Sequence, residues 1–131
     1  MKTTFLAAAV TLLAVSCTND PDPIVEYEKT PGSVAKTELI GAARAGVPVQ
    51  LDVTFSLHNS CSSFDSFESW KEADTLVVKV WGLTPKDSGC TKEIRYHTKR
   101  FTYTYPSPGT YYLKFMRFNG NLHRDTLIVT P

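Results

Sequence analysis

Apolar residues recur at every second position through most of this chain, and that alternation constrains its fold more than any other feature. Between residues 49 and 58, Val, Leu, Val, Phe and Leu alternate with Gln, Asp, Thr, Ser and His. Because successive side chains of a β-strand point to opposite faces, the pattern predicts a strand with one buried face. The same alternation covers residues 76–81, 101–105 and 111–116.

Turn signals separate these segments at intervals of about 8–12 residues, as in a β-sandwich. Asn119-Gly120-Asn121 is a strong hairpin signal. Further strands are expected near residues 34–40, 64–70 and 126–130, and no pattern supports a helix longer than three turns. We therefore predict an all-β fold, an immunoglobulin-like antiparallel β-sandwich of about seven strands over residues 33–131.

Residues 63–73 are compatible with two structures. Phe64, Phe67 and Trp70 are spaced by three, which suits a helix capped by Ser63. A strand containing a bulge fits the same residues. We favour the strand because the sandwich requires one at this point.

The first 17 residues have the pattern of a lipoprotein signal. Lys2 precedes an apolar run of 11 residues, Phe5 to Val15, and Ser16-Cys17 closes it. The run has the length of a signal-peptide core and is too short to span a bilayer as a helix. The motif resembles that of bacterial lipoproteins, which usually have Leu three residues before the cysteine, whereas here Ala14 holds that position. A plain secretory peptide with an incidental cysteine is the alternative.

On this interpretation residues 1–16 are removed and Cys17 becomes the lipid-bearing first residue. Its acyl chains would each contribute about 0.8 kcal/mol per buried CH₂ to membrane attachment. Residues 17–32 are rich in Pro and Asp at their start and are predicted to form a flexible tether. Thr18 in place of Asp implies, by the same resemblance, the outer membrane. Which face displays the domain stays open.

The two remaining cysteines, Cys61 and Cys90, are expected to form a structural disulfide in an oxidising compartment. Neither belongs to a C-x-x-C motif or adjoins a histidine, which disfavours a metal pair or a reactive thiol. Because both fall at strand ends, the disulfide is predicted to join two loops. Gly109-Thr110-Tyr111 opens a late strand, and we expect Tyr111 to form a tyrosine corner; a simple core aromatic is the alternative.

Several of these segments together resemble a group of small immunoglobulin-like lipoproteins of Gram-negative bacteria. The resemblance is carried by Asn59-Ser60-Cys61, Cys90-Thr91, Thr102-Tyr103, Pro108 to Tyr111, and Asp125 to Val129. It covers residues 33–131 and implies a sandwich fold. That group carries no established activity, so the resemblance implies no substrate or catalytic residue.

The charge balance and the absence of known motifs argue against nucleic-acid binding, metal binding and catalysis. Removal of Lys2 leaves 13 basic residues against 13 acidic ones, which argues against a nucleic-acid partner. The three histidines are far apart, no G-x-S-x-G motif is present, and no spacing suits a metal. We predict no cofactor, no metal site and no catalytic residue.

Four residues form a tentative binding surface, namely Trp70, Trp81, Arg95 and His97. An exposed tryptophan offers a flat face for a sugar ring or a protein partner, although for Trp81 we favour a role as the cover of a sandwich end. Arg95 and His97 lie in the basic run 92–100, for which we favour an edge strand whose charges prevent aggregation.

The leading functional expectation is therefore a lipid-anchored, non-catalytic binding or assembly module of the cell envelope. Its partners would be the membrane, through the lipid, and an envelope protein or glycan. The alternatives are an inhibitor of secreted or envelope hydrolases, presented by the loops at Cys61 and Cys90, and a small hydrolytic enzyme.

Overall fold

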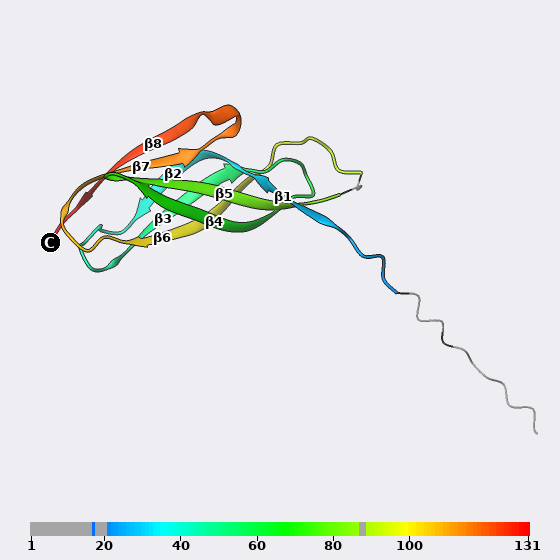
Figure 1. Ribbon diagram of the computed structural model, residues 1–131, viewed down its shortest axis with the longest axis horizontal. Helices are drawn as coiled ribbons and strands as arrows, with labels where there is room; N and C mark the ends of the chain where they lie inside the picture. The colour runs from blue at the N-terminus through cyan, green and yellow to red at the C-terminus, as the bar shows by residue number, and fades with distance from the viewer. Residues whose placement is uncertain (1–16, 18–20, 87–88) are drawn as a thin grey trace, which may run out of the picture.

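Two β-sheets pack face to face in the computed structural model of the chain (Figure 1). The structure describes residues 17, 21–86 and 89–131. The eight strands are β1 Tyr27–Pro31, β2 Ser33–Ile40, β3 Pro48–Ser56, β4 Ser63–Glu72, β5 Thr75–Pro85, β6 Tyr96–Thr104, β7 Gly109–Met116 and β8 Leu122–Val129. A short 3-10 turn, Phe118–Gly120, links the last two. The predicted all-β sandwich is confirmed. The predicted signal peptide, residues 1–16, lies outside the described residues.

The smaller sheet has the order β2-β3-β6 and is antiparallel throughout. In the larger sheet, β5 pairs with β4 along one side. Its other side is shared by β1, which pairs with residues 81–85, and β7, which pairs with residues 75–78. β8 then pairs with β7 and forms the edge.

The larger sheet corrects the expectation of a purely antiparallel sandwich, because β5 and β7 run parallel. The β4–β5 hairpin places its second strand beside β7 and its first strand at the edge. The pairing of β5 with β7 joins segments that are far apart in the sequence, and the alternation of apolar residues does not encode such a pairing. The other pairings within the two sheets are antiparallel.

Strand β1 corrects the predicted tether, residues 17–32, because its last part is a strand of the larger sheet. Residues 27–31 instead pair with the open half of β5. Their side chains are almost all exposed, so no apolar alternation marks them as a strand. Gly32 then carries the chain from one sheet to the other, and its amide donates to the Val80 carbonyl at 2.8 Å.

Of the two structures expected for residues 63–73, the bulged strand is confirmed and the helix is wrong. β4 pairs with β5 over its length, with a register shift between Phe64 and Ser66. The two phenylalanines of β4 point inward, where Phe67 meets Phe101 with ring centroids 5.3 Å apart. The core between the sheets is formed by side chains from both layers, the largest fully buried ones being Tyr105, Phe55, Phe115, Leu113, Val34, Val53, Val78 and Val80.

Candidate functional site

The outer face of the larger sheet presents side chains in rows across the strands. One row contains Trp70, Val77, Lys114 and Arg124, taken in turn from β4, β5, β7 and β8. Because residues paired across neighbouring strands point to the same face, these four side chains lie on one side of the sheet. Val77 is only 3% exposed although it points away from the core. Its neighbours in the row therefore pack over it.

The adjacent row contains Glu72, Thr75, Tyr112 and Thr126. Tyr112 is 46% exposed and Trp70 is 37% exposed. The indole N–H of Trp70 donates to Glu72 Oε1 at 3.1 Å, a bond that restrains its ring. Two accessible aromatic rings and two cations thus share a single sheet face.

A groove with a volume of about 300 Å³ crosses this face over β5, β7 and β8. Tyr112, Lys114, Arg124, Thr75 and Thr126 line it. Lys114 and Arg124 are directly opposite each other in the β7–β8 register. Like charges at directly opposed positions destabilise a sheet. Among the residues that the structure describes, neither cation has a carboxylate within ion-pair distance.

Trp81 lies on the same outer face, nearer the end where the chain enters the sandwich. Its ring packs between two ammonium groups, Lys79 Nζ at 3.9 Å and Lys29 Nζ at 5.2 Å from the ring centroid. Its indole N–H donates to Glu68 Oε2 at 2.7 Å. Trp81 is half-buried within this polar cluster on the sheet face.

The carboxylate of Asp65 belongs to the same neighbourhood. A hydrogen bond from Ser66 is the largest influence on the Asp65 carboxyl and lowers its pKa; desolvation opposes it, and the hydrogen bond and charge of Lys29, 3.4 Å away, help to hold the pKa below its usual value. Lys29 is therefore shared between a carboxylate and the Trp81 ring. Lys114 and Arg124 of β7 and β8 have neither a carboxylate nor an aromatic ring as a partner of this kind within the described part of the chain.

Arg95 and His97 do not join the tryptophans. Arg95 precedes β6 and pairs with Glu93 at 3.0 Å. His97 lies on β6, the edge strand of the smaller sheet, and its ring stacks on Phe55 with centroids 5.8 Å apart. The structure therefore separates the four residues of the predicted surface into two places, because β6 belongs to the other sheet.

Cys61 and Cys90 form the predicted disulfide, with a Cα–Cα distance of 5.6 Å. It joins the turn after β3 to the segment before β6, and the Ser60 amide donates to the Thr91 carbonyl beside it at 3.0 Å. These loops lie at the end of the sandwich where the chain enters, opposite the C-terminus (Figure 1). Cys17 is exposed and has a free thiol.

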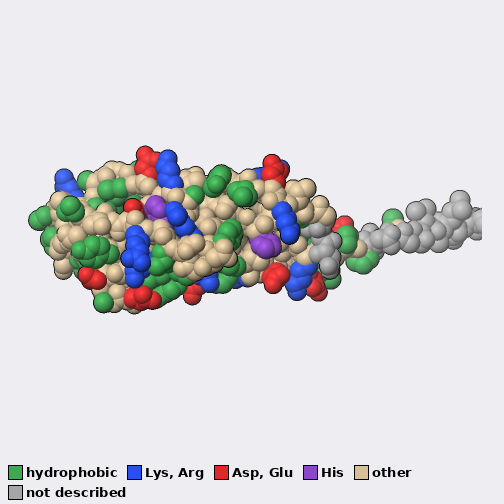
Figure 2. All heavy atoms as spheres, turned by 90° about the horizontal axis from the view of Figure 1, so that it is seen from above, with side chains coloured by type: hydrophobic (Ala, Val, Ile, Leu, Met, Phe, Trp, Pro, Cys, Tyr) green, Lys and Arg blue, Asp and Glu red, His purple; other side chains and the backbone are tan. Residues whose placement is uncertain are grey.

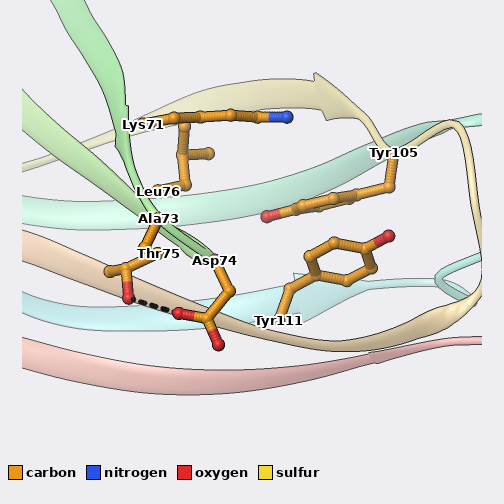
Figure 3. A pocket seen from close by; sticks show the side chains of 7 residues that line it. All are labelled: Lys71, Ala73, Asp74, Thr75, Leu76, Tyr105 and Tyr111. Atoms are coloured by element: carbon orange, nitrogen blue, oxygen red, sulfur yellow. Dashed lines mark hydrogen bonds between the residues drawn. The ribbon is translucent and has the colours of Figure 1, made fainter.

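At the far end of the sandwich, the hydroxyl of Tyr111 donates to the Ser107 carbonyl at 2.7 Å. This is the contact expected of a tyrosine corner. The Tyr111 ring packs on Tyr105, with centroids 4.2 Å apart. Figure 3 shows that the two hydroxyls point in different directions, that of Tyr105 toward a small cavity lined by Lys71, Leu76 and Asp74.

The cavity has a volume of about 40 Å³. Tyr105 is 2% exposed, and its hydroxyl has no hydrogen-bond partner among the described residues. Burial, with smaller contributions from Tyr103 and Tyr111, raises the pKa of Tyr105 to about 12. The site has room for a water molecule or two and for no larger ligand.

A hydroxyl–imidazole–carboxylate cluster joins β2 to β8 and was not anticipated from the sequence. Thr37 Oγ1 lies 3.0 Å from His123 Nε2 and donates to Asp125 Oδ2. Arg117 Nη2 lies 3.1 Å from His123 Nδ1. Thr37 is 86 residues from His123 and 88 residues from Asp125 along the chain. No local sequence motif could therefore have predicted this cluster.

The order of donors in this cluster differs from that of a catalytic triad. A guanidinium only donates, so His123 Nδ1 accepts from Arg117 and Nε2 carries the ring proton. Nε2 therefore donates to Thr37, whose own proton goes to Asp125. A general base would have to accept the hydroxyl proton at Nε2. The cluster instead fastens the edge of one sheet to the edge of the other.

Basic and acidic side chains are interspersed on the face of the molecule shown in Figure 2. Within residues 17, 21–86 and 89–131, no three His, Cys, Asp or Glu side chains group in a way that could hold a metal ion. In the same part of the chain, no helix has the length and apolar character needed to cross a membrane.

Comparison with known proteins places the fold in a family. Residues 51–129, more than half of the chain, match the model of the ORF11 beta-sandwich domain. The match begins within β3 and ends with β8, so it includes the outer face of the larger sheet. No curated protein and no solved structure matches the chain. The chain belongs to the ORF11 beta-sandwich domain family.

Proposed function

We propose that this protein is a lipid-anchored, non-catalytic binding module of the cell envelope, attached to the outer membrane through Cys17. The observation that carries the binding role is the outer face of the larger sheet. There Trp70 and Tyr112 expose their rings beside Lys114 and Arg124. Exposed aromatic rings beside cations are typical of recognition surfaces.

The position of Cys17 supports the anchor. It is exposed and precedes the start of β1, at Tyr27, by ten positions. The described residues that follow it from 21 to 26 belong to no strand. The chain joins the sandwich at the end opposite the C-terminus (Figure 1). A lipid on Cys17 would therefore hold the sandwich by one end, leaving the sheet face with Tyr112 accessible.

The same geometry favours binding over the two alternatives. An inhibitor would present the loops joined by Cys61 and Cys90, but these lie at the end that the lipid would hold near the membrane (Figure 1). A hydrolase would need a base that accepts a proton from its nucleophile, whereas His123 donates to Thr37 in the hydroxyl–imidazole–carboxylate cluster.

Site-specific photo-crosslinking in cells tests the binding role. A photoreactive residue replacing Ile128, which is 69% exposed on β8 in the row next to Tyr112, leaves the rings and cations of this face intact and should yield crosslinked envelope material. The matched control replaces Thr102, which is exposed on β6 of the other sheet. Equal crosslinking at the two positions, or none at residue 128, would refute a binding function of this face.

A further inference from the structure

We propose that the groove across β5, β7 and β8 binds an acidic oligosaccharide, with an acid group held between Lys114 and Arg124 and a sugar ring stacked on Tyr112. This inference rests on the proposed binding function and names the class of ligand for the same sheet face.

The charge arrangement is the first argument. Lys114 and Arg124 are cross-strand partners, so their Cβ atoms are about 4.5–5.5 Å apart. Bringing two cations together costs free energy unless an anion lies between them. Arg124 is exposed and Lys114 is half-buried, so both can reach a ligand in the groove. A carboxylate, sulfate or phosphate group on the ligand would supply the missing negative charge.

The acidic side chains near the groove are already engaged by other groups. Asp125 is one of its lining residues, but its carboxylate accepts a hydrogen bond from Thr37 and lies 3.6 Å from His123. Glu72, at the end of the neighbouring row, accepts a hydrogen bond from Trp70. Neither carboxylate forms an ion pair with the two groove cations.

The aromatic rings and the floor of the groove indicate a sugar rather than a peptide. Protein partners gain affinity by inserting side chains into pockets, but Thr75, which lines the groove, and Val77 in the neighbouring row are both buried, so the sheet surface here is closed. What the face offers is ring surface at Trp70 and Tyr112 and the exposed hydroxyl of Thr126. Stacking against rings and hydrogen bonding to hydroxyl groups are the contacts that a sugar makes.

The separation of the two rings sets the length of the ligand. Trp70 and Tyr112 stand two strands and one row apart. With strands about 4.8 Å apart and a rise of about 3.4 Å per residue, this corresponds to roughly 12 Å. That span exceeds one sugar ring, so an oligosaccharide touching both rings would bind more tightly than the corresponding monosaccharide.

The test uses the full-length chain purified in detergent and titrated calorimetrically with oligosaccharides carrying carboxylate, sulfate or phosphate groups. Each is paired with a form in which the acid is esterified or removed. We expect at least one acidic oligosaccharide to bind, with its neutral counterpart about tenfold or more weaker, because hydrogen bonds to charged groups contribute more than neutral ones. Affinity should fall as salt concentration rises.

Variants assign the binding to the groove. Lys114→Gln and Arg124→Gln should each weaken binding by about tenfold or more. Lys36→Gln is the control, since Lys36 is an exposed cation on β2 of the other sheet. Neither groove variant should be less stable than the wild type, because each removes a like-charge pair. Reduced affinity therefore cannot be attributed to unfolding.

Three results would overturn the inference: no binding by any acidic oligosaccharide, equal binding of the neutral forms, or equal losses in Lys114→Gln and Lys36→Gln. Preferential binding of an acidic peptide would also overturn it. If crosslinking at residue 128 still succeeded in those cases, the binding module would stand and only the ligand class would be wrong.

Discussion

Tyr105 shows at the scale of a single residue how burial governs the chemistry of this sandwich. Its hydroxyl is buried without a partner among the described residues, beside a cavity of about 40 Å³. An unpaired buried hydroxyl costs about 1–3 kcal/mol. The sequence predicts a tyrosine corner at Tyr111, which agrees with its bond to Ser107, but it does not reveal that the Tyr105 hydroxyl bonds to no described residue.

Replacing Tyr105 by Phe should therefore stabilise the protein by about 1 kcal/mol, measured as the free energy of unfolding in denaturant at pH 7. Tyr111→Phe is the matched control, because it removes a hydroxyl that is bonded at 2.7 Å, and it should destabilise. Destabilisation by Tyr105→Phe would mean that a water molecule in the cavity bonds to the hydroxyl.

Because the pKa of Tyr105 is raised, we expect the free energy of unfolding to depend on pH. The pKa of Tyr105 is raised to about 12 in the folded protein, against about 10 in an unfolded chain. Between these values the unfolded chain loses a proton that the folded chain keeps, so the free energy of unfolding should fall as pH rises from 10 to 12. Denaturation at pH 9 and pH 11 should show a larger fall in wild type than in Tyr105→Phe. Equal falls would contradict the raised pKa.

Gly82 is constrained by packing rather than by its backbone angles. A Cβ atom placed there would lie 2.8 Å from Leu57 Cδ2 and 3.2 Å from the Ser63 carbonyl oxygen. Gly82→Ala is expected to lower the free energy of unfolding by about 1–3 kcal/mol through overpacking. Gly89→Ala is the control, since nothing lies within 4 Å of the corresponding position. Equal stability of the two variants would show that Leu57 moves aside freely.

At the scale of the elements, alternation was sufficient to predict most strands, and it failed where neither face of a strand is apolar. β3 can be recognised from the sequence because its buried residues alternate with polar ones. β1 does not, since it is held to β5 by backbone pairing while its side chains stay in solvent. The parallel β5–β7 pair was equally inaccessible, because strand order depends on contacts between distant segments.

The candidate site was only partly predictable for the same reason. The sequence singles out Trp70 and Trp81 as candidate binding aromatics. It does not single out Lys114 and Arg124, because only the β7–β8 register shows that these two cations lie opposite each other. The predicted surface also contains Arg95 and His97, because the sequence does not show that β6 belongs to the other sheet. His97 packs on Phe55 in the other sheet.

The link between β2 and β8 provides a test at this scale. Thr37→Val removes the hydroxyl that connects His123 and Asp125 across the two sheets. We expect it to lower the free energy of unfolding by about 1–3 kcal/mol, since it removes the hydrogen bonds that join His123 and the Asp125 carboxylate to β2. Thr54→Val is the control, because its bond to Thr98 is exposed and lies within one sheet. A variant at residue 37 no less stable than this control would contradict the proposed link.

At the scale of the whole molecule, the sandwich has two different ends. One holds the disulfide-bonded loops and the start of β1, and the other holds the tyrosine cluster and the C-terminus (Figure 1).

The disulfide spans a sequence separation of 29 residues. Its removal in a Cys61→Ala/Cys90→Ala variant should lower the free energy of unfolding by about 3–4 kcal/mol. An unchanged denaturation midpoint would show that the surrounding hydrogen bonds hold these loops without it.

We propose that these two different ends serve a module anchored by lipid at Cys17. Intact-mass spectrometry of the chain recovered from cell membranes tests the anchor, with Cys17→Ser as the control. We expect a mature chain that begins at Cys17 and is heavier than residues 17–131 by its acyl groups, while the variant carries no lipid. A membrane-recovered chain that retains residues 1–16, or that begins at Cys17 with an unmodified thiol, would contradict it.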